Sequence, residues 1–309
     1  MPSILGIDTS NYTTSAAVFD GVKMAGAKKL LPVEKGKLGL RQSDAVFYHV
    51  RQLPEILEAL PFGSTEISAV GVSNRPRSME GSYMPCFLAG CCAAKAVSLS
   101  LSVPLYTFSH QQGHIAAALY SAGKLDLLKE RFIAFHVSGG TTEALIVTPC
   151  EEDIIKTEIA ARSLDLKGGQ AVDRVGKMLG LGFPAGVQLE KLALQTDKKF
   201  KITPCIKGTD CSLSGIENKC KDMLLKGYPK EEIASYCIQS ILAALDGMTA
   251  ALLKKYGGLP LVFAGGVMSN AILRKKLTEK YGAFFAEPKY SSDNAAGIAV
   301  LAAVKKGDI

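Results

Sequence analysis

Apolar and polar positions follow the same order in two separate regions of the chain. Near the N-terminus, the apolar run Ile4–Ile7 leads into a polar turn at residues 8–14, and a second apolar run follows at Ser15–Phe19. An apolar run, a turn of small residues and another apolar run return at Ile133–Ser138 and Glu143–Thr148. Each region predicts a strand–turn–strand unit. A second copy of one hairpin predicts a duplicated fold.

Helical periodicity marks the segments between these hairpins. Apolar residues recur every three to four positions in residues 43–60, and Pro61 follows directly, which predicts a helix that ends there. The pattern predicts further helices at residues 83–100 (an apolar helix that should pack inside), 110–122, 171–181, 187–196, 231–256, 270–281 and 293–306. It predicts strands at residues 67–72, 103–106, 259–266 and 282–286, a hairpin with a loop at 23–42, and an irregular segment at 201–213. Alternating strands and helices are typical of an α/β fold.

Length and composition restrict the class of protein. The 309 residues are enough for two domains or one large α/β domain. The chain has no run of eighteen uncharged apolar residues and no secretion signal that we recognise, so we expect a cytoplasmic protein without a membrane span. Its eight cysteines include no C-x-x-C pair, as in reduced cytosolic proteins. The net charge of +7 permits an anionic partner such as RNA.

Two histidines lie four residues apart in the predicted helix at 110–122. His110 and His114 would therefore share one helix face. Two imidazoles in this arrangement can bind one metal ion, and a half-exposed helix face is the alternative. Asp293 lies at the start of the last predicted helix, where it is either a third ligand or an N-cap.

Two glycine-containing turns predict contacts with an anion. In Val137-Ser-Gly-Gly-Thr-Thr142 the glycines allow backbone amides to approach a phosphate, and a plain hairpin turn is the alternative. A predicted strand runs into Gly265 and Gly266 before the helix at 270–281, which offers amides and a helix N-terminus to a nucleotide. A tight loop between strand and helix is the alternative there.

Several segments together resemble the tRNA threonylcarbamoyltransferase (TsaD) family, also known under the older name of glycoprotease family. The resemblance covers nearly the whole chain. It is carried by Leu5-Gly-Ile-Asp-Thr-Ser10, His110-Gln-Gln-Gly-His114, Val137-Ser-Gly-Gly-Thr-Thr142, Val172-Asp-Arg-Val175, Leu179-Gly-Leu-Gly-Phe-Pro-Ala-Gly186, Cys211-Ser-Leu-Ser-Gly215, Ala264-Gly-Gly-Val-Met-Ser-Asn270 and Ser292-Asp-Asn-Ala-Ala296.

The resemblance implies a duplicated actin-like α/β fold of the sugar kinase and actin superfamily (ASKHA). Such a fold has two lobes with a nucleotide cleft between them. We accordingly expect residues 1–108 plus 293–309 to form the N-terminal lobe and residues 109–292 to form the C-terminal lobe.

The resemblance also implies the site. His110, His114 and Asp293 would be the catalytic residues and would hold one divalent metal ion, either Fe or Zn, with Mg as a further option. His136 is one more candidate ligand, and a histidine that lines the cleft or the core is the alternative. An adenine nucleotide would meet Thr9, Ser10, His136, Val137, Ser138, Gly139, Gly140, Thr141, Asp173, Gly186, Glu190, Gly265, Gly266 and Asn270.

The implied reaction is tRNA modification. Family members transfer a threonylcarbamoyl group from threonylcarbamoyl-AMP to the adenosine beside the tRNA anticodon. The nucleotide in the site would be this adenylate or ATP, ADP or AMP. The implied partners are tRNA and either TsaB-like and TsaE-like proteins or a second copy of the chain.

The sequence departs from the family pattern at three places. Tyr12 and Thr13 stand where bacterial members have two acidic residues, Thr141 replaces a His or Asn, and Arg75–Gly81 replaces a glycine-rich loop. These changes leave two other functions open: carbamoyl transfer to another acceptor, and a diverged, non-catalytic subunit that binds nucleotide. A metalloprotease is disfavoured because the chain has no H-E-x-x-H motif.

Overall fold

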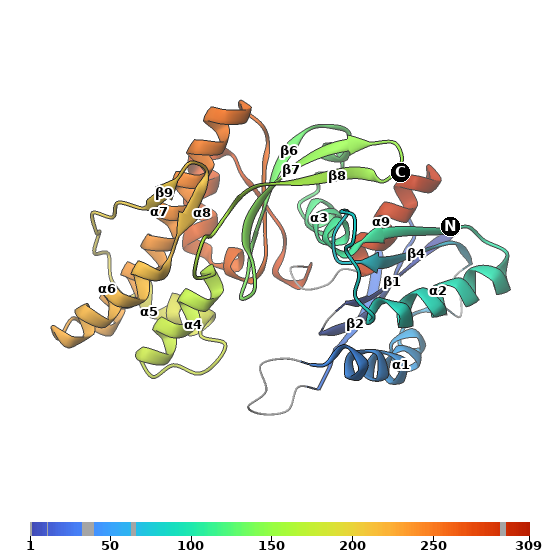
Figure 1. Cartoon of the computed structure of the whole chain (residues 1–309), viewed down its shortest axis with the longest axis horizontal. Coiled ribbons are helices and arrows are strands. Elements are labelled where there is room, and N and C mark those ends of the chain that lie inside the picture. Colours follow the sequence, from blue (N-terminus) through green and yellow to red (C-terminus); the bar gives the residue numbers. More distant parts are fainter. Residues whose placement is uncertain (1, 11, 33–39, 63–65, 291–294) are drawn as a thin grey trace. The chain divides into compact units, whose positions relative to one another are not determined.

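The chain forms two compact units. A computed structural model describes residues 2–10, 12–32, 40–62, 66–290 and 295–309. Unit 1 consists of Met1–Lys129, Thr148–Thr157 and Lys289–Ile309, and unit 2 consists of Glu130–Val147 and Glu158–Pro288 (Figure 1).

Each unit is built on a five-stranded sheet with the same strand order. The first sheet has the order β3-β2-β1-β4-β5, with β1 antiparallel to β2 and parallel to β4. The second has the order β8-β7-β6-β11-β12, with β6 antiparallel to β7 and parallel to β11. The strands are β1 Ser3–Ser10, β2 Thr13–Phe19, β3 Met24–Leu30, β4 Ile67–Arg75, β5 Leu105–Ser109, β6 Phe132–Val137, β7 Thr142–Cys150, β8 Ile154–Arg162, β11 Leu261–Ala264 and β12 Phe284–Phe285. The predicted duplication is confirmed by this shared topology.

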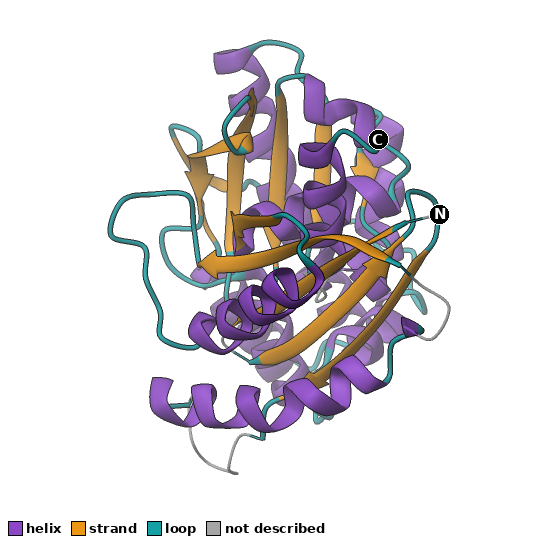
Figure 2. Ribbon diagram, turned by 90° about the vertical axis from the view of Figure 1, so that its right-hand side faces the viewer, coloured by secondary structure: helices purple, strands orange, loops and turns teal. Residues whose placement is uncertain are grey.

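Helices pack on both sheets (Figure 2). Unit 1 has α1 Gln42–Glu58, α2 Phe87–Leu101, α3 His110–Ser121 and α9 Ala295–Lys306. Unit 2 has α4 Gly168–Met178, α5 Gly186–Ala193, α6 Ser214–Leu225, α7 Lys230–Tyr256 and α8 Ala271–Tyr281. Short 3₁₀ turns lie at Leu125–Lys129, Gly266–Ser269 and Pro288–Tyr290.

Two glycines bring α9 very close to the first sheet. Gly6 of β1 and Gly71 of β4 are neighbours in the parallel register. A Cβ atom at Gly71 would lie 2.9 Å from the Ile298 carbonyl oxygen, and one at Gly6 would overlap the Ala295 carbonyl oxygen. Side chains alternate along a strand, so Ile7 points to the opposite face, where it contacts the helix α2 at Gly90.

Helix α3 belongs to unit 1, which differs from the predicted lobe boundary. We expected residues 109–292 to form one lobe, but residues 109–129 and Thr148–Thr157 pack with the N-terminal unit. The reason is a close crossing of α3 and α9, in which Gly297 approaches the Gly113 carbonyl so closely that a Cβ atom would overlap it. Small residues at a helix crossing allow such an approach, and the predicted hydrophobic periodicity did not reveal it.

The core of unit 2 forms around β6 and α7. Ile133, Phe135 and Val137 of β6 belong to one buried cluster with side chains from α4 to α8. Phe135 stacks on Phe263 of β11, with ring centroids 4.4 Å apart. By length and composition α7 could cross a membrane. However, half of its most apolar 18-residue stretch is buried in unit 2, as expected for a core helix.

Several predicted elements differ in detail from the structure. Residues 201–213 were expected to be irregular, but they contain the small hairpin β9 Cys205–Lys207 and β10 Asp210–Ser212. Strand β8 and helix α6 were not predicted. The apolar helix expected at 83–100 begins at Phe87 and leaves Leu88, Leu99 and Leu101 exposed, so only one of its faces packs inside. The predicted start of the last helix, with Asp293, lies outside the described residues.

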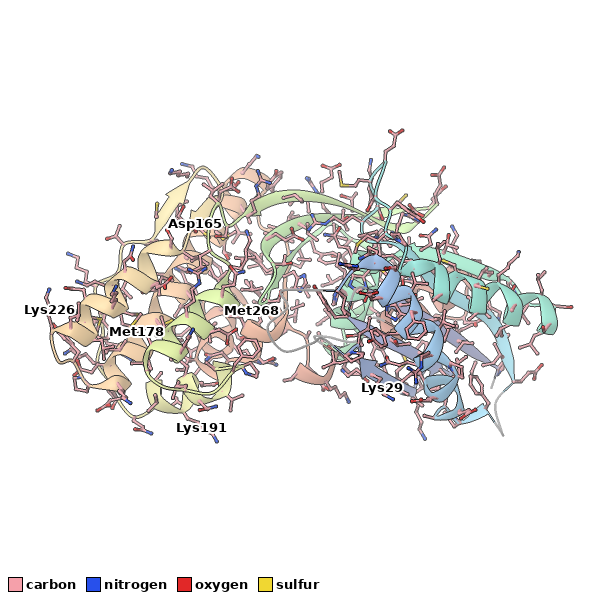
Figure 3. The ribbon with its side chains drawn as sticks, turned by 60° about the horizontal axis from the view of Figure 1, so that its bottom comes forward. Lys29, Asp165, Met178, Lys191, Lys226 and Met268 are labelled. Atoms are coloured by element: carbon pink, nitrogen blue, oxygen red, sulfur yellow. The ribbon has the colours of Figure 1, made fainter. Side chains whose placement is uncertain are left out.

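Asp165, labelled in Figure 3, joins the start of α6 to the segment that follows β8. Its carboxylate accepts hydrogen bonds from the backbone amides of Leu166, Leu213 and Ser214 and from the Ser214 hydroxyl, at 2.6–3.3 Å. Partial burial raises the pKa of Asp165, but the hydrogen bonds from Leu213, Ser214 and Leu166 outweigh it and hold the pKa below its ordinary value. The carboxylate therefore acts as a helix cap that comes from a distant part of the chain.

We expect Asp165→Asn to lower the free energy of unfolding by about 1–2 kcal/mol at pH 7, because the amide has one acceptor oxygen in place of two and its hydrogen bonds are no longer charge-assisted. Because the folded-state pKa is lowered, the stabilisation exists above the pKa of the unfolded chain and is lost as the pH falls through the folded-state value. The difference between the variant and the wild type should thus shrink below a pH of about 4. Urea unfolding at pH 7 and at acidic pH measures both effects. The exposed Asp197→Asn variant is the control, and an Asp165→Asn penalty that stays constant down to pH 3 would contradict the capping role.

Candidate functional site

In unit 1, three parallel strands end at one edge of the sheet. Strand β1 pairs with β4 and β4 pairs with β5, all parallel, and Arg75 is the register partner of Ser109. The carboxyl ends of adjacent parallel strands meet at the same edge, which is where α/β folds bind ligands. This edge carries Asp8, Arg75 and, directly after β5, His110.

Asp8 orients the ring of His110. The Asp8 side chain is fully buried. Its Oδ2 atom lies 2.7 Å from His110 Nδ1, and its Oδ1 atom accepts a hydrogen bond from the Ser10 amide at 2.8 Å. An ionised carboxylate can only accept, so Nδ1 of His110 is the donor in this contact, and Nε2 is the ring nitrogen that does not contact Asp8. Metal-binding histidines are commonly held in this way by a carboxylate. Asp8 was not among the predicted site residues, and its place at the end of an apolar strand is the signal that could have revealed it.

The two histidines lie side by side on α3, as predicted. Their ring centroids are 4.6 Å apart in an edge-to-face arrangement. A capping box fixes the first turn of the helix, because the Ser109 hydroxyl accepts from the Gln112 amide and the Gln112 side chain accepts from the Ser109 amide. The side-chain amide of Gln112 also donates to the carbonyls of Asp153 and Ile155. The histidines therefore stand on a rigid helix end.

This donor set fits part of a metal site. Two imidazoles on one helix face, one of them held by a buried carboxylate, are suitable ligands for Fe or Zn. The predicted third ligand, Asp293, lies outside the described residues. Within the ranges that the structure describes, no group of three His, Cys, Asp or Glu side chains is placed to share an ion. His136 belongs to unit 2, where it is half-buried in β6 opposite Glu143 and Ala264.

The segment that departs from the family loop packs against the start of α3. The Ser78 hydroxyl donates to the Ser109 hydroxyl at 3.0 Å, and the Gln111 amide donates to the Pro76 carbonyl at 3.1 Å. Arg75 forms an ion pair with Asp153, with 3.5 Å between Nη2 and Oδ2. The altered loop is thus in direct contact with the helix that presents the histidines.

The predicted ligand residues Thr9 and Ser10 are buried in the protein. The Thr9 hydroxyl donates to the Cys86 carbonyl and accepts from the Gly90 amide, both at 3.0 Å. These two hydrogen bonds join β1 to the start of α2.

A buried histidine lies behind the first turn. Nδ1 of His49 is 2.8 Å from the Thr14 hydroxyl, which donates to Gln52. Nε2 of His49 has no hydrogen-bond partner in the part of the chain that the structure describes. Burial lowers the pKa of His49 to about 4, although the nearby charge of Asp8 raises it. His49 is therefore neutral at pH 7. The helical periodicity gave no sign of this role.

Unit 2 contains a pocket of 530 Å³ that gathers many of the predicted nucleotide ligands. Gly139, Asp173, Gly186, Glu190, Gly266 and Asn270 all line it. The other predicted ligands of unit 2 do not line it: His136 and Val137 lie at the end of β6, Ser138, Gly140 and Thr141 lie in the turn that follows, and Gly265 lies directly after β11.

The turn after β6 presents backbone amides. The Ser138 amide donates to the Thr141 carbonyl, and the Thr141 amide donates to the Ser138 hydroxyl. Among the described residues, no protein acceptor is found for the amides of Gly139 and Gly140. Helix α4 begins beside this turn, since the Gly169 amide donates to the Ser138 carbonyl at 3.0 Å. Free amides beside a helix N-terminus favour an anion such as a phosphate.

Two carboxylates stand in the same pocket. One oxygen of Asp173 accepts from the Ala185 amide at 2.9 Å, and one oxygen of Glu190 accepts from the Ala271 amide at 2.7 Å. The second oxygen of each carboxylate accepts no hydrogen bond from the described residues. Asn270 caps α8 through the Leu273 amide. The free carboxylate oxygens can accept hydrogen bonds from sugar hydroxyls.

The rest of the pocket wall is mostly apolar. Sequence reasoning missed these residues, and the helical period of α7 could have indicated only two of them, Ile238 and Ile241. The apolar residues are Val172, Pro184, Val187, Leu189, Ile238, Ile241, Val267, Leu273 and Pro288. An apolar wall with a few placed polar groups is typical of a small-molecule site, and here the combination suits an adenine nucleotide.

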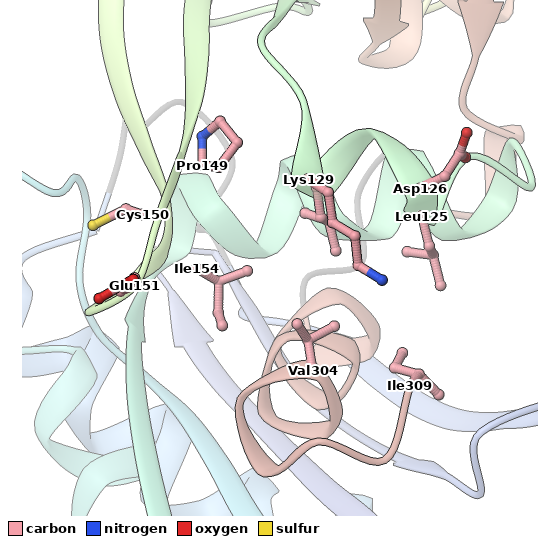
Figure 4. A pocket seen from close by; sticks show the side chains of 10 residues that line it. Leu125, Asp126, Lys129, Pro149, Cys150, Glu151, Ile154, Val304 and Ile309 are labelled. Carbon is pink, nitrogen blue, oxygen red and sulfur yellow. The ribbon is translucent and has the colours of Figure 1, made fainter.

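A larger cavity of 630 Å³ lies in unit 1 (Figure 4). Aliphatic side chains such as Leu125, Ile154, Val304 and Ile309 line it, and none of the predicted site residues does. The larger of these two cavities is therefore not the candidate functional site.

Comparison with known proteins gives a consistent result. The family model TsaD, tRNA N6-adenosine threonylcarbamoyltransferase, matches residues 47–300. A tRNA N6-adenosine threonylcarbamoyltransferase of Thermosipho melanesiensis is 30% identical, over 96% of this chain and 93% of the relative. One of Campylobacter fetus is 31% identical, over 96% of this chain and 90% of the relative.

Solved structures agree on the fold. Component A of (R)-2-hydroxyglutaryl-CoA dehydratase from Acidaminococcus fermentans superposes with a TM-score of 0.58 at 18% identity, and the match covers 100% of both chains. HypF in its phosphate- and nucleotide-bound form has a TM-score of 0.59 at 16% identity, over 100% of this chain and 55% of HypF. At such identities the likeness shows the fold alone, and it confirms the predicted duplicated actin-like class.

Proposed function

Because this chain belongs to the TsaD family of tRNA N6-adenosine threonylcarbamoyltransferases, we propose that it transfers a threonylcarbamoyl group from threonylcarbamoyl-AMP to the adenosine beside a tRNA anticodon. The observation that carries the proposal is the unit 2 pocket. It combines an apolar wall, two carboxylates with free oxygens and a turn with free backbone amides.

Different groups in the pocket would bind different parts of the adenylate. The apolar wall receives the adenine ring, and the free oxygens of Asp173 and Glu190 accept hydrogen bonds from the ribose hydroxyls. The amides of Gly139 and Gly140 donate to the phosphate. These contacts fix the adenylate, so that its activated carbonyl is held for attack.

His110, His114 and Asp293 would hold one divalent ion, Fe or Zn or alternatively Mg, with His136 as an additional candidate. When bound, such an ion supplies a Lewis acid that polarises a carbonyl oxygen. Asp8 accepts a hydrogen bond from Nδ1 of His110, so Nε2 is the ring nitrogen that would bind the ion. The support for this assignment is the pairing of the two rings and the buried carboxylate behind one of them.

In the transfer step, the main role of the protein is to position the amine and the activated carbonyl. The exocyclic amine forms a bond to the carbamoyl carbon, and the bond from that carbon to the phosphate oxygen breaks. AMP leaves with the electron pair, and the amine loses one proton. Tyr12 and Thr13 bring no carboxylate to this step, so the proton passes to another group or to water.

The proposed reaction implies the cellular location and the partners of the protein. The protein would act in the cytoplasm, with tRNA as its substrate. TsaB-like and TsaE-like proteins, or a second copy of the chain, would be its partners. The net charge of +7 is suitable for an RNA substrate.

A transfer assay tests the proposal. The purified protein would be mixed with threonylcarbamoyl-AMP that carries a labelled threonine, with and without unmodified tRNA, alone and with the partner subunits. We expect label on tRNA only when tRNA and enzyme are both present. No transfer by protein that binds AMP would contradict the proposal.

One observation favours a second candidate function. The loop at residues 76–81 packs against the start of α3, and it follows Arg75 in place of a glycine-rich loop. A diverged paralogue that carbamoylates another acceptor, or that only binds nucleotide beside a partner, would fit this change. Label on a small molecule or a protein instead of tRNA would select the first version. AMP binding without any turnover, together with capture of a partner, would select the second.

A further inference from the structure

The turn between α4 and α5 exposes an aromatic ring. Phe183 is 87% exposed, and Val187, one turn further along in α5, is 67% exposed. Pro184, Gly186 and Val187 line the unit 2 pocket, whereas Phe183 does not. Phe183 is therefore next in sequence to a pocket residue without being part of the pocket wall. Its ring is available to a group other than the pocket's own occupant.

The backbone that carries Phe183 is firmly held. The Ala185 amide donates to Asp173, and the Leu181 amide donates to the Gly176 carbonyl at 2.9 Å. Gly176 also packs so closely on Ala185 that a Cβ atom at residue 176 would overlap the Ala185 side chain. The ring is thus presented from a fixed turn, so a partner that stacks on it finds the turn already in place.

Unit 2 as a whole is positively charged, which favours an anionic partner. Five of the seven excess positive charges lie in unit 2, where 20 Lys and Arg residues face 15 Asp and Glu residues. Lys177 in the last turn of α4 and Lys191 in the last turn of α5 are exposed (Figure 3 labels Lys191). Neither forms an ion pair with an acidic residue in the described parts of the chain. An aromatic ring with basic residues on the helices at either side is typical of a surface that binds single-stranded RNA.

We propose that Phe183 stacks on an unpaired base of the RNA substrate, next to the acceptor adenosine. This inference rests on the proposed function, because it assumes that the acceptor is a tRNA. Every base has an aromatic face, so the contact positions the RNA without reading its sequence. Phe183 is therefore a substrate-positioning residue.

The test compares Phe183→Ala with Phe183→Tyr and Phe183→Trp in the full chain. We expect Phe183→Ala to raise the Kd and the KM for unmodified tRNA about 5- to 140-fold, the range for one stacked base. Phe183→Tyr and Phe183→Trp should restore binding, since both keep a flat ring. The affinity for AMP, measured by calorimetry, should not change in any of the variants. Leu225→Ala is the control, because Leu225 on α6 is a comparably exposed apolar residue of the same unit, at 79%.

The outcomes separate this inference from the proposed function. If tRNA is modified and Phe183→Ala leaves its KM at the wild-type value, the stacking contact is wrong and the proposed function stands. If Phe183→Ala alters only the assembly state or the capture of a protein partner, the ring is a protein contact and the inference is overturned. If the wild type binds AMP but no tRNA, the function and the stacking contact fall together.

Discussion

Replacing His110 or His114 by alanine is expected to lower threonylcarbamoyl transfer at least about 100-fold, because each change removes one of two paired imidazoles. Polarisation of a carbonyl by a metal ion contributes several kcal/mol to transition-state stabilisation, and 1.4 kcal/mol corresponds to about a tenfold change in rate. The same variants should bind less metal, which elemental analysis of the purified proteins measures directly. The affinity for AMP should stay the same, since neither residue lines the unit 2 pocket.

Asp8→Asn should cause a smaller loss of transfer and metal binding than the histidine substitutions. The amide cannot replace the negative charge that accepts the proton of His110 Nδ1. Loss of such a supporting carboxylate typically costs 10- to 100-fold in metal affinity or activity. Asp126→Asn, the same substitution at an exposed residue of unit 1, should behave as wild type. If His110→Ala and Asp8→Asn both keep full activity and full metal content, the histidine pair is not the metal site.

Gly265→Ala is expected to destabilise unit 2 by at least about 2 kcal/mol, for two reasons that act together. Gly265 has a φ of +100°, which side-chain-bearing residues rarely adopt, and a Cβ atom there would overlap the Val137 carbonyl oxygen. The turn after β6 would have to move, and that turn carries the free amides of the pocket. We therefore expect a melting temperature that is lower by about 4–8 °C, together with weaker AMP binding.

The neighbouring glycine provides a matched control. A Cβ atom at Gly266 would meet nothing within 4 Å, and its φ is not in the left-handed region. Gly266→Ala should therefore keep the wild-type melting temperature. Because Gly266 lines the pocket, its added methyl group should weaken AMP binding if the nucleotide lies against this wall. Equal melting temperatures for the two variants would show that the close approach of Gly265 to Val137 does not limit stability.

Much of the fold was already determined by local patterns in the sequence. Apolar runs such as Ile4–Ile7 predict strands because they alternate with polar turns, and the i, i+4 spacing of His110 and His114 places both rings on one face of α3 through helix geometry alone. The second strand–turn–strand unit at residues 133–148 predicted the duplication. These inferences succeeded because they depend on contacts between residues that are close along the chain.

Only the tertiary structure decided which residues meet across the chain. Asp8 lies 102 positions before His110, and their hydrogen bond follows from the parallel pairing of β1, β4 and β5. The assignment of α3 to unit 1 depends on the close approach of Gly113 and Gly297. A local pattern contains no information on such pairs, because the distance between them is set by the register of strands and the packing of helices. The placement of the two histidines on one helix face was thus predictable from the sequence, whereas the carboxylate beside His110 and the apolar wall of the unit 2 pocket required the folded chain.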